Sequence, residues 1–154
     1  MEDYKEELRK RIWNRLRIVK GKNPEFFRLD AAGALIEWDQ YGEHTPNGWQ
    51  VDHACPKKLL EENGIKEDYW DYIEDLRPFN TANNELKSND FPKYIRAVYY
   101  DEHLDRNVKD GVSYYIVNRQ VQKAVQKHFQ LPIKLFGDGH VSSASAIMNY
   151  LGMQ

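Results

Sequence analysis

Two adjacent residues, Asp52 and His53, have side chains suited to hydrolytic chemistry. A neutral imidazole accepts a proton from an attacking water near neutral pH, and a carboxylate is a preferred ligand of a hard cation such as Mg²⁺. Further along the chain, Asn84, Lys87 and Ser88 follow one another at helical spacing and project together. An Asp52 carboxylate and an Asn84 amide oxygen form a sparse but sufficient set of protein ligands. Together with His53 they predict metal-assisted hydrolysis of a phosphodiester.

This pair requires a strand that stops in the right place. Residues 48–54 predict a strand, in which neighbouring side chains point to opposite faces. Asp52 and His53 therefore serve one site only if the strand ends or bends beside them, and Pro56 favours such a break.

The helix residues need a second strand before them. Residues 76–79 predict a short strand, and Pro78 would keep it at a sheet edge. Asn80 or Thr81 is suited to cap a helix that runs to about residue 89. The predicted order around the site is thus strand, strand, helix.

Hydrophobic spacing and turn residues predict the remaining elements. They are a basic amphipathic helix over 3–20, a loop over 21–33, a strand over 34–38 that forms a hairpin with 48–54, short helical pieces between 58 and 74, a strand or helix over 94–100, a helix over 117–129 and a last helix over 144–152. The basic residues of the first helix are either a solvated face or a stripe that contacts phosphates.

Composition limits the class of protein. The chain has 154 residues, of which 41% are hydrophobic and 13% aromatic, which is enough for one packed domain with or without an appendage. No apolar run approaches the roughly 20 residues that a membrane span needs, so we expect a cytoplasmic protein with no membrane segment. One cysteine excludes an internal disulfide and a zinc site made of cysteines alone. The net charge of -2 does not by itself indicate a nucleic-acid-binding protein.

The motifs have a fixed order along the chain. That order is Asp52-His53, then Asp75-Leu76-x-Pro78-Phe79, then Asn83-Asn84-x-x-Lys87-Ser88. It resembles the HNH endonuclease family, in the form with an Asp-His pair and a helix asparagine, over residues 12–92. The resemblance implies an α+β fold: a ββα-metal (His-Me) finger, with an N-terminal helix before it and a helical or mixed C-terminal extension after it. We expect a nuclease domain over 1–92, with 93–154 either packed on it or forming an accessory DNA-binding or partner region.

The resemblance assigns roles to individual residues. His53 matches the general base, Asp52 the first metal ligand and Asn84 the helix ligand, with Asn83 as the ligand if the register differs by one. Asp75 stands where the family has a catalytic-site asparagine that pins the loop after the histidine. A carboxylate keeps the shape but loses the donor, so Asp75 either lowers activity, pairs with a lysine or contacts the metal.

Basic residues near the motifs are expected to bind substrate. They are Lys57, Lys58, Arg77 and Lys87, the last of which faces a phosphate or steadies the helix. His44 is a further residue that could reach the substrate. The cysteine pairs of zinc-binding relatives are absent, so we expect no structural zinc and a buried, hydrophobic role for Cys55.

The resemblance implies a metal-dependent DNA endonuclease with one divalent cation, Mg²⁺ or else Mn²⁺, acting on double-stranded DNA. One alternative is a non-catalytic nucleic-acid-binding protein on a degenerate HNH scaffold, which Asp75 and the net charge of -2 favour. Another is an assembly partner, for example in phage packaging, that acts with a phage or host protein or as a homodimer. The basic helix over 3–20 would then be its docking surface.

Overall fold

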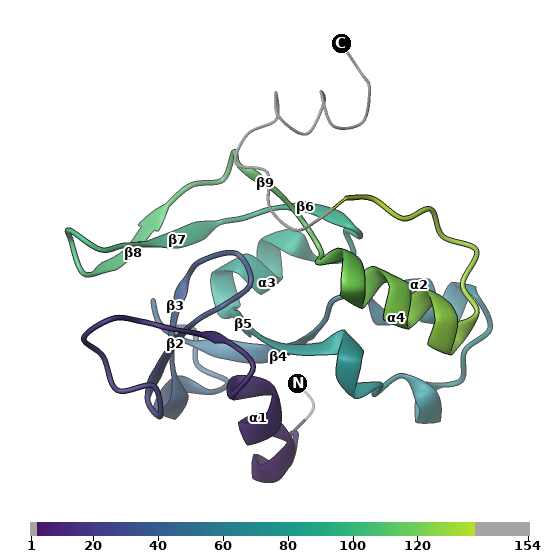
Figure 1. The fold of residues 1–154 in the computed structure, drawn as a ribbon, viewed down its shortest axis with the longest axis horizontal. Helices are drawn as coiled ribbons and strands as arrows, with labels where there is room; N and C mark the ends of the chain where they lie inside the picture. Colours follow the sequence, from purple (N-terminus) through teal and green to yellow (C-terminus); the bar gives the residue numbers. More distant parts are fainter. Residues whose placement is uncertain (1–2, 138–154) are drawn as a thin grey trace.

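The computed structural model describes residues 3–137, which form four α-helices and nine short strands (Figure 1). The helices are α1 (Glu6–Trp13), α2 (Lys57–Glu62), α3 (Thr81–Lys87) and α4 (Arg119–Phe129). The strands are β1 (Arg17–Ile18), β2 (Phe27–Leu29), β3 (Leu35–Glu37), β4 (Trp49–His53), β5 (Leu76–Asn80), β6 (Lys93–Ile95), β7 (Val98–Asp101), β8 (Arg106–Lys109) and β9 (Tyr114–Ile116). The predicted α+β class is confirmed.

The strands of the described segment form small antiparallel sheets. Their orders are β1-β2-β3, β4-β5, β6-β9 and β7-β8. In Figure 1 the β7-β8 hairpin and helix α4 lie toward opposite ends of the long axis, with β4, β5 and α3 between them. The elements that carry the predicted motifs are therefore central in the molecule.

The first helix is shorter than its hydrophobic spacing predicts. It ends at Trp13, and Arg17 and Ile18 instead pair with Leu29 and Arg28 as strands β1 and β2. The prediction of a helix to residue 20 and of a loop over 21–33 was therefore wrong there. Pairing with a distant strand outweighed local helical periodicity, which is a weak determinant of structure.

The predicted hairpin between 34–38 and 48–54 was also wrong, although both strands exist. Strand β3 pairs with β2, and β4 pairs with β5 over its whole length. β3 stays beside β4 through other bonds: the Glu37 N–H donates to the Asn47 carbonyl at 3.0 Å, and Trp49 Nε1 donates to the Glu37 carbonyl at 2.8 Å.

The elements around the motifs follow the prediction closely. Strand β5 lies at the edge of a two-stranded sheet, and Asn80 caps α3 by accepting from the N–H groups of Ala82 and Asn83. Helix α4 matches the predicted helix over 117–129, and the segment over 94–100 is made of strands. The helix predicted over 144–152 lies outside the described residues.

Three groups of buried side chains hold these elements together. An aromatic cluster of Trp13, Trp38, Tyr41 and Trp49 joins α1 to β4, with the tryptophan ring centroids 5.3 to 5.6 Å apart. A second group includes Phe79, Tyr94 and Val117, and so joins residues from both sides of position 92. The third packs α2 against α4. No helix among the described residues is long and apolar enough to cross a membrane.

Candidate functional site

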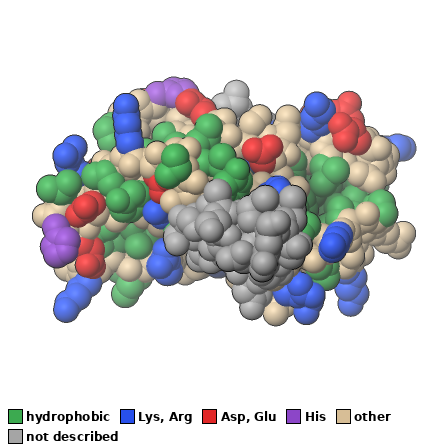
Figure 2. Space-filling view, turned by 90° about the horizontal axis from the view of Figure 1, so that it is seen from above, with side chains coloured by type: hydrophobic (Ala, Val, Ile, Leu, Met, Phe, Trp, Pro, Cys, Tyr) green, Lys and Arg blue, Asp and Glu red, His purple; other side chains and the backbone are tan. Residues whose placement is uncertain are grey.

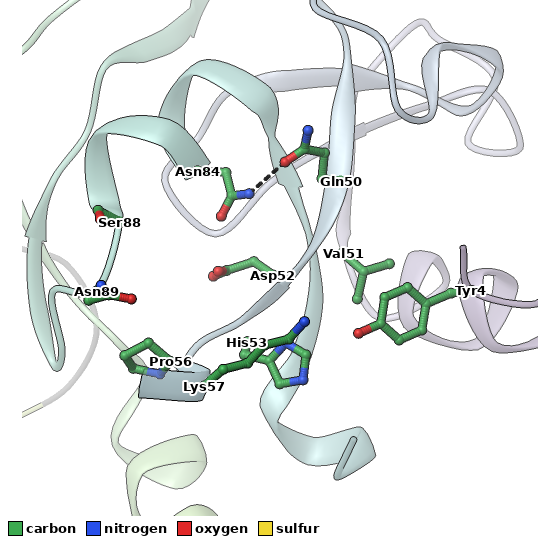
Figure 3. A pocket seen from close by; sticks show the side chains of 10 residues that line it. All are labelled: Tyr4, Gln50, Val51, Asp52, His53, Pro56, Lys57, Asn84, Ser88 and Asn89. Atoms are coloured by element: carbon green, nitrogen blue, oxygen red, sulfur yellow. Dashed lines mark hydrogen bonds between the residues drawn. The ribbon is translucent and has the colours of Figure 1, made fainter. Parts of the chain in front are cut away.

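A pocket of about 240 Å³ brings together the predicted base and both predicted metal ligands (Figure 3). Its walls come from β4, from the start of α2, from α3 and the turn after it, and from the N-terminal segment. The lining residues are Tyr4, Gln50, Val51, Asp52, His53, Pro56, Lys57, Asn84, Ser88 and Asn89.

The strand ends where the pair requires it to end. β4 stops at His53, and the chain bends at Ala54 and Cys55. Asp75 holds this bend, because its carbonyl accepts from the Ala54 N–H at 2.9 Å and its Oδ1 accepts from the Cys55 N–H at 2.7 Å. Asp52 and His53 therefore both line the pocket although they are neighbours on a strand.

The His53 ring is held by a carboxylate that the motifs did not indicate. Asp71 Oδ1 lies 2.9 Å from His53 Nε2 and also accepts a hydrogen bond from the Tyr4 hydroxyl at 3.2 Å. Burial lowers the pKa of His53, and the hydrogen bond that the ring donates to Asp71 opposes part of that effect. The ring is therefore neutral near pH 7, and a proton on Nε2 shared with Asp71 leaves Nδ1 as the basic nitrogen.

Asp52 is buried between two cations. Its Oδ2 accepts from Arg77 Nε at 3.0 Å, and its Oδ1 lies 3.7 Å from Lys87 Nζ. The Asp52–Arg77 pair follows from the register of the sheet, in which these residues face each other across β4 and β5.

Lys87 does not reach the pocket surface. Its side chain is fully buried, and Nζ lies 3.4 Å from the His53 carbonyl oxygen that accepts its hydrogen bond. Burial lowers the pKa of Lys87, and Asp52 opposes that effect. This corrects the expectation of a phosphate-facing Lys87, because in this structure the ammonium group steadies α3 against the end of β4.

The two adjacent asparagines of α3 have different surroundings. Asn84 Nδ2 donates to Gln50 Oε1 at 2.7 Å, which leaves the Asn84 carbonyl oxygen facing the pocket on the side of Asp52 (Figure 3). Asn83 is fully buried and bonds to Asp30, Ala97 and Val98. The structure therefore places Asn84, not Asn83, in the pocket.

The pocket offers few oxygen ligands for a metal ion. The Asp52 carboxylate and the Asn84 carbonyl oxygen both face it (Figure 3), although Asp52 Oδ2 is also engaged by Arg77. Within residues 3–137 there is no group of three or more His, Cys, Asp or Glu side chains placed to hold a metal ion. Two oxygen ligands fit a hard cation that keeps most of its waters, and they do not fit a structural zinc.

Asp75 lies behind the pocket and does not line it. Burial raises the pKa of Asp75 well above its usual range, although its bond from the Cys55 N–H acts in the opposite direction. Asp75 Oδ1 accepts the hydrogen bond that holds the loop after His53, and Asp75 does not line the pocket. The structure therefore does not favour direct contact between Asp75 and a metal ion held by Asp52 and Asn84.

The predicted substrate-binding residues are not all at the pocket. Lys57 lines it, whereas Lys58 is exposed outside it. The Arg77 side chain is only 14% exposed and is directed at Asp52, which corrects its assignment as a direct phosphate contact. His44 lies outside the lining and pairs with Glu85 at 3.1 Å. Cys55 is a buried hydrophobe, as predicted, and burial raises its pKa to about 12.

No protein-family model matches the chain, and neither a curated protein nor a solved structure matches it. The chemistry of the pocket is therefore derived from its own residues. Asp71 could not be found from motif spacing, because it lies in an irregular segment that contains several other acidic residues.

Proposed function

We propose that the protein is a metal-dependent DNA endonuclease of the HNH type, which hydrolyses phosphodiester bonds. The observation that carries this proposal is the convergence of Asp52, His53 and Asn84 on one pocket. The order β4, β5, α3 around that pocket supports a ββα-metal finger, with α3 packed on both strands.

His53 acts as the general base. Its buried, neutral ring is oriented by Asp71, and this arrangement suits removal of a proton from a water molecule. Asp71 then stabilises the imidazolium that forms, because its carboxylate shares the proton on Nε2.

Asp52 and Asn84 would hold the divalent cation, Mg²⁺ or Mn²⁺. When bound, the cation supplies electrostatic stabilisation of the charge that develops on the phosphate and the leaving oxygen. Arg77 and Lys87 flank the Asp52 carboxylate and hold it in place beside Asn84. Gln50 fixes the orientation of the Asn84 amide so that an oxygen faces the cation.

The DNA backbone would be held by groups at the rim of the pocket. Lys57 provides a charge there, and Ser88 and Asn89 provide neutral hydrogen-bonding groups. On the face seen in Figure 2, basic side chains are interspersed with acidic and hydrophobic ones. At the pocket itself, contacts from Lys57, Ser88 and Asn89 would position the substrate.

The test is nicking of a supercoiled plasmid with Mg²⁺ or Mn²⁺, compared with EDTA. We expect His53→Ala to reduce the rate by about 100-fold or more, since a general base contributes at least that much. His103→Ala is the matched control, because His103 is an exposed histidine outside the pocket. Equal cleavage by wild type and His53→Ala would remove the proposal.

One observation favours a second candidate, a nucleic-acid-binding protein without nuclease activity. Asp52 is already paired with Arg77 and lies near Lys87, and these two cations oppose the binding of a third. This candidate predicts DNA binding that weakens steeply with salt, together with no metal-dependent cutting. A gel-shift series at rising salt, run beside the nicking assay, separates the two.

A further inference from the structure

A second pocket, of about 450 Å³, lies beside β5 and shares no lining residue with the first. Much of its wall is apolar. The apolar side chains come from α1 and the residues after it, from β2, β5 and β9, and from α4: Ile12, Leu16, Leu29, Leu76, Ile116 and Val121. Its size is that of many small-molecule sites.

Three polar groups of this pocket make no hydrogen bond of normal length, although the Tyr94 hydroxyl and the Arg77 guanidinium lie close enough to interact. Among residues 3–137, the buried side-chain atoms with no hydrogen bond are Asp75 Oδ2, Arg77 Nη2 and the Tyr94 hydroxyl, and all three residues line this pocket. Asp75 and Tyr94 are each only 1% exposed. Buried polar groups are nearly always hydrogen-bonded, so three such atoms in one pocket indicate a missing polar partner.

The three groups favour a ligand that accepts hydrogen bonds. Arg77 Nη2 only donates, and a tyrosine hydroxyl donates readily. Asp75 Oδ1 is already occupied by the Cys55 N–H, so a proton on Asp75 sits on Oδ2 and is directed to the same partner. Burial raises the pKa of Asp75, the Cys55 N–H acts against this effect, Asp52 acts with it, and Lys87 and Arg77 act against it.

The charge available to the ligand is small. Arg77 shares its guanidinium with Asp52 on the other side, and Arg15 is paired with Glu74. The wall also contains Arg17 and Asp30, so its positive charges are largely matched by carboxylates. A single negative charge matches this environment better than a dianion such as phosphate. The apolar wall would cover an apolar body attached to that charge.

We propose that this pocket binds a small monocarboxylic acid with an apolar body. The carboxylate accepts from Arg77 and Tyr94, and the body lies against the side chains of α1, β9 and α4. The proposal does not rest on the proposed nuclease activity, because the lining residues differ and binding alone tests it, although Arg77 also pairs with Asp52.

The experiment titrates the full chain with hexanoate and with benzoate, followed by calorimetry and by methyl NMR signals of Ile116 and Val121. Hexylamine and inorganic phosphate are the ligand controls. We expect binding of at least one acid, with shifts of those methyl signals, and no binding of hexylamine or phosphate. Failure of both acids, or binding of hexylamine instead, would overturn the proposal and leave a pocket that holds water.

Two substitutions test the polar contacts. Tyr94→Phe removes only the hydroxyl and should weaken binding by about tenfold, whereas Tyr99→Phe, outside the pocket, should not. Asp75→Asn keeps an oxygen for the Cys55 N–H and places an amide donor toward the ligand, so binding should persist. Equal affinity of Tyr94→Phe and wild type, or loss of binding in Asp75→Asn with the fold intact by NMR, would contradict the proposed carboxylate.

Discussion

The His53 ring owes its orientation to Asp71, a residue half exposed on the segment before β5. Asp71→Ala should lower the nicking rate by about tenfold, because the ring loses its orienting partner. Asp71 raises the pKa of His53, so its removal lowers that pKa. The base is then deprotonated down to a lower pH, and the acidic limb of the pH–rate profile should move to lower pH while the plateau falls.

Asp68→Ala is the control for this change, since it removes an exposed carboxylate from the same irregular segment. It should leave both the rate and the acidic limb unchanged. A profile of Asp71→Ala that superimposes on wild type after scaling would show that Asp71 does not act through the ring of His53.

For individual residues, the sequence indicated which side chains lie together but not how deeply each one is buried. Asp52, His53 and Asn84 line one pocket, as their types and order predicted. Helical spacing placed Lys87 on the face of Asn84 but gave no measure of its burial. Asp71 contributes through the fold of an irregular segment, for which no periodic pattern exists.

Two neighbouring asparagines of helix α3 are expected to have different roles, Asn83 in stability and Asn84 in catalysis. Asn83→Ala removes one of the two donors to Asp30 Oδ2 and the partner of the backbone of residues 97 and 98, and should lower the free energy of unfolding by about 3 kcal/mol. Asn84→Ala should cost little stability but reduce nicking strongly. Urea unfolding and the nicking assay on both variants check this. Equal stability losses would contradict the assignment.

A second element-scale prediction concerns the turn after β8. Burial of the Asp110 carboxyl acts to raise its pKa, but hydrogen bonds from Arg96 and from the Val112 and Ser113 N–H groups outweigh this and lower the pKa to about 2. The group therefore stabilises the fold above its ordinary pKa of 3.8, and this contribution is lost as the pH falls toward 2.

Asp110→Asn should thus be less stable than wild type by about 2 kcal/mol at pH 6, and the difference should shrink toward pH 2. Urea unfolding at several pH values measures it. Glu102→Gln is the control, as it changes an exposed carboxylate in the neighbouring β7-β8 turn. A difference that stays constant with pH would show that the Asp110 carboxylate is not the cause.

The elements that the sequence predicted well are those with a strong local signal. Asn80 was a recognisable cap, and α4 has valines and a phenylalanine on one face. Strands β1 and β2 have only two and three residues and exist because they pair with each other and with β3. Such pairing depends on the tertiary fold, so neither these strands nor the true partner of β4 could be identified locally.

At the scale of the whole molecule, the segment after Pro92 is part of the same core as the site. Tyr94 and Val117 pack with Phe79 and Ala54, and the backbone of residues 97 and 98 bonds to Asn83. A fragment of residues 1–92 would expose this surface and leave the Asn83 side-chain oxygen without the N–H groups of residues 97 and 98. We expect it to unfold without a cooperative transition in circular dichroism. A cooperative transition at the midpoint of the full chain would show that 1–92 folds alone.

The aromatic cluster has a consequence for spectroscopy. Trp13, Trp38 and Trp49 lie close enough to exchange excitation energy, whereas Trp70 packs with the separate α2–α4 group. The emission of a Trp70→Phe protein would therefore come from the trio alone. Because the trio joins α1 to β4, whose far end carries His53, its fluorescence would report whether the scaffold of the reactive strand is assembled.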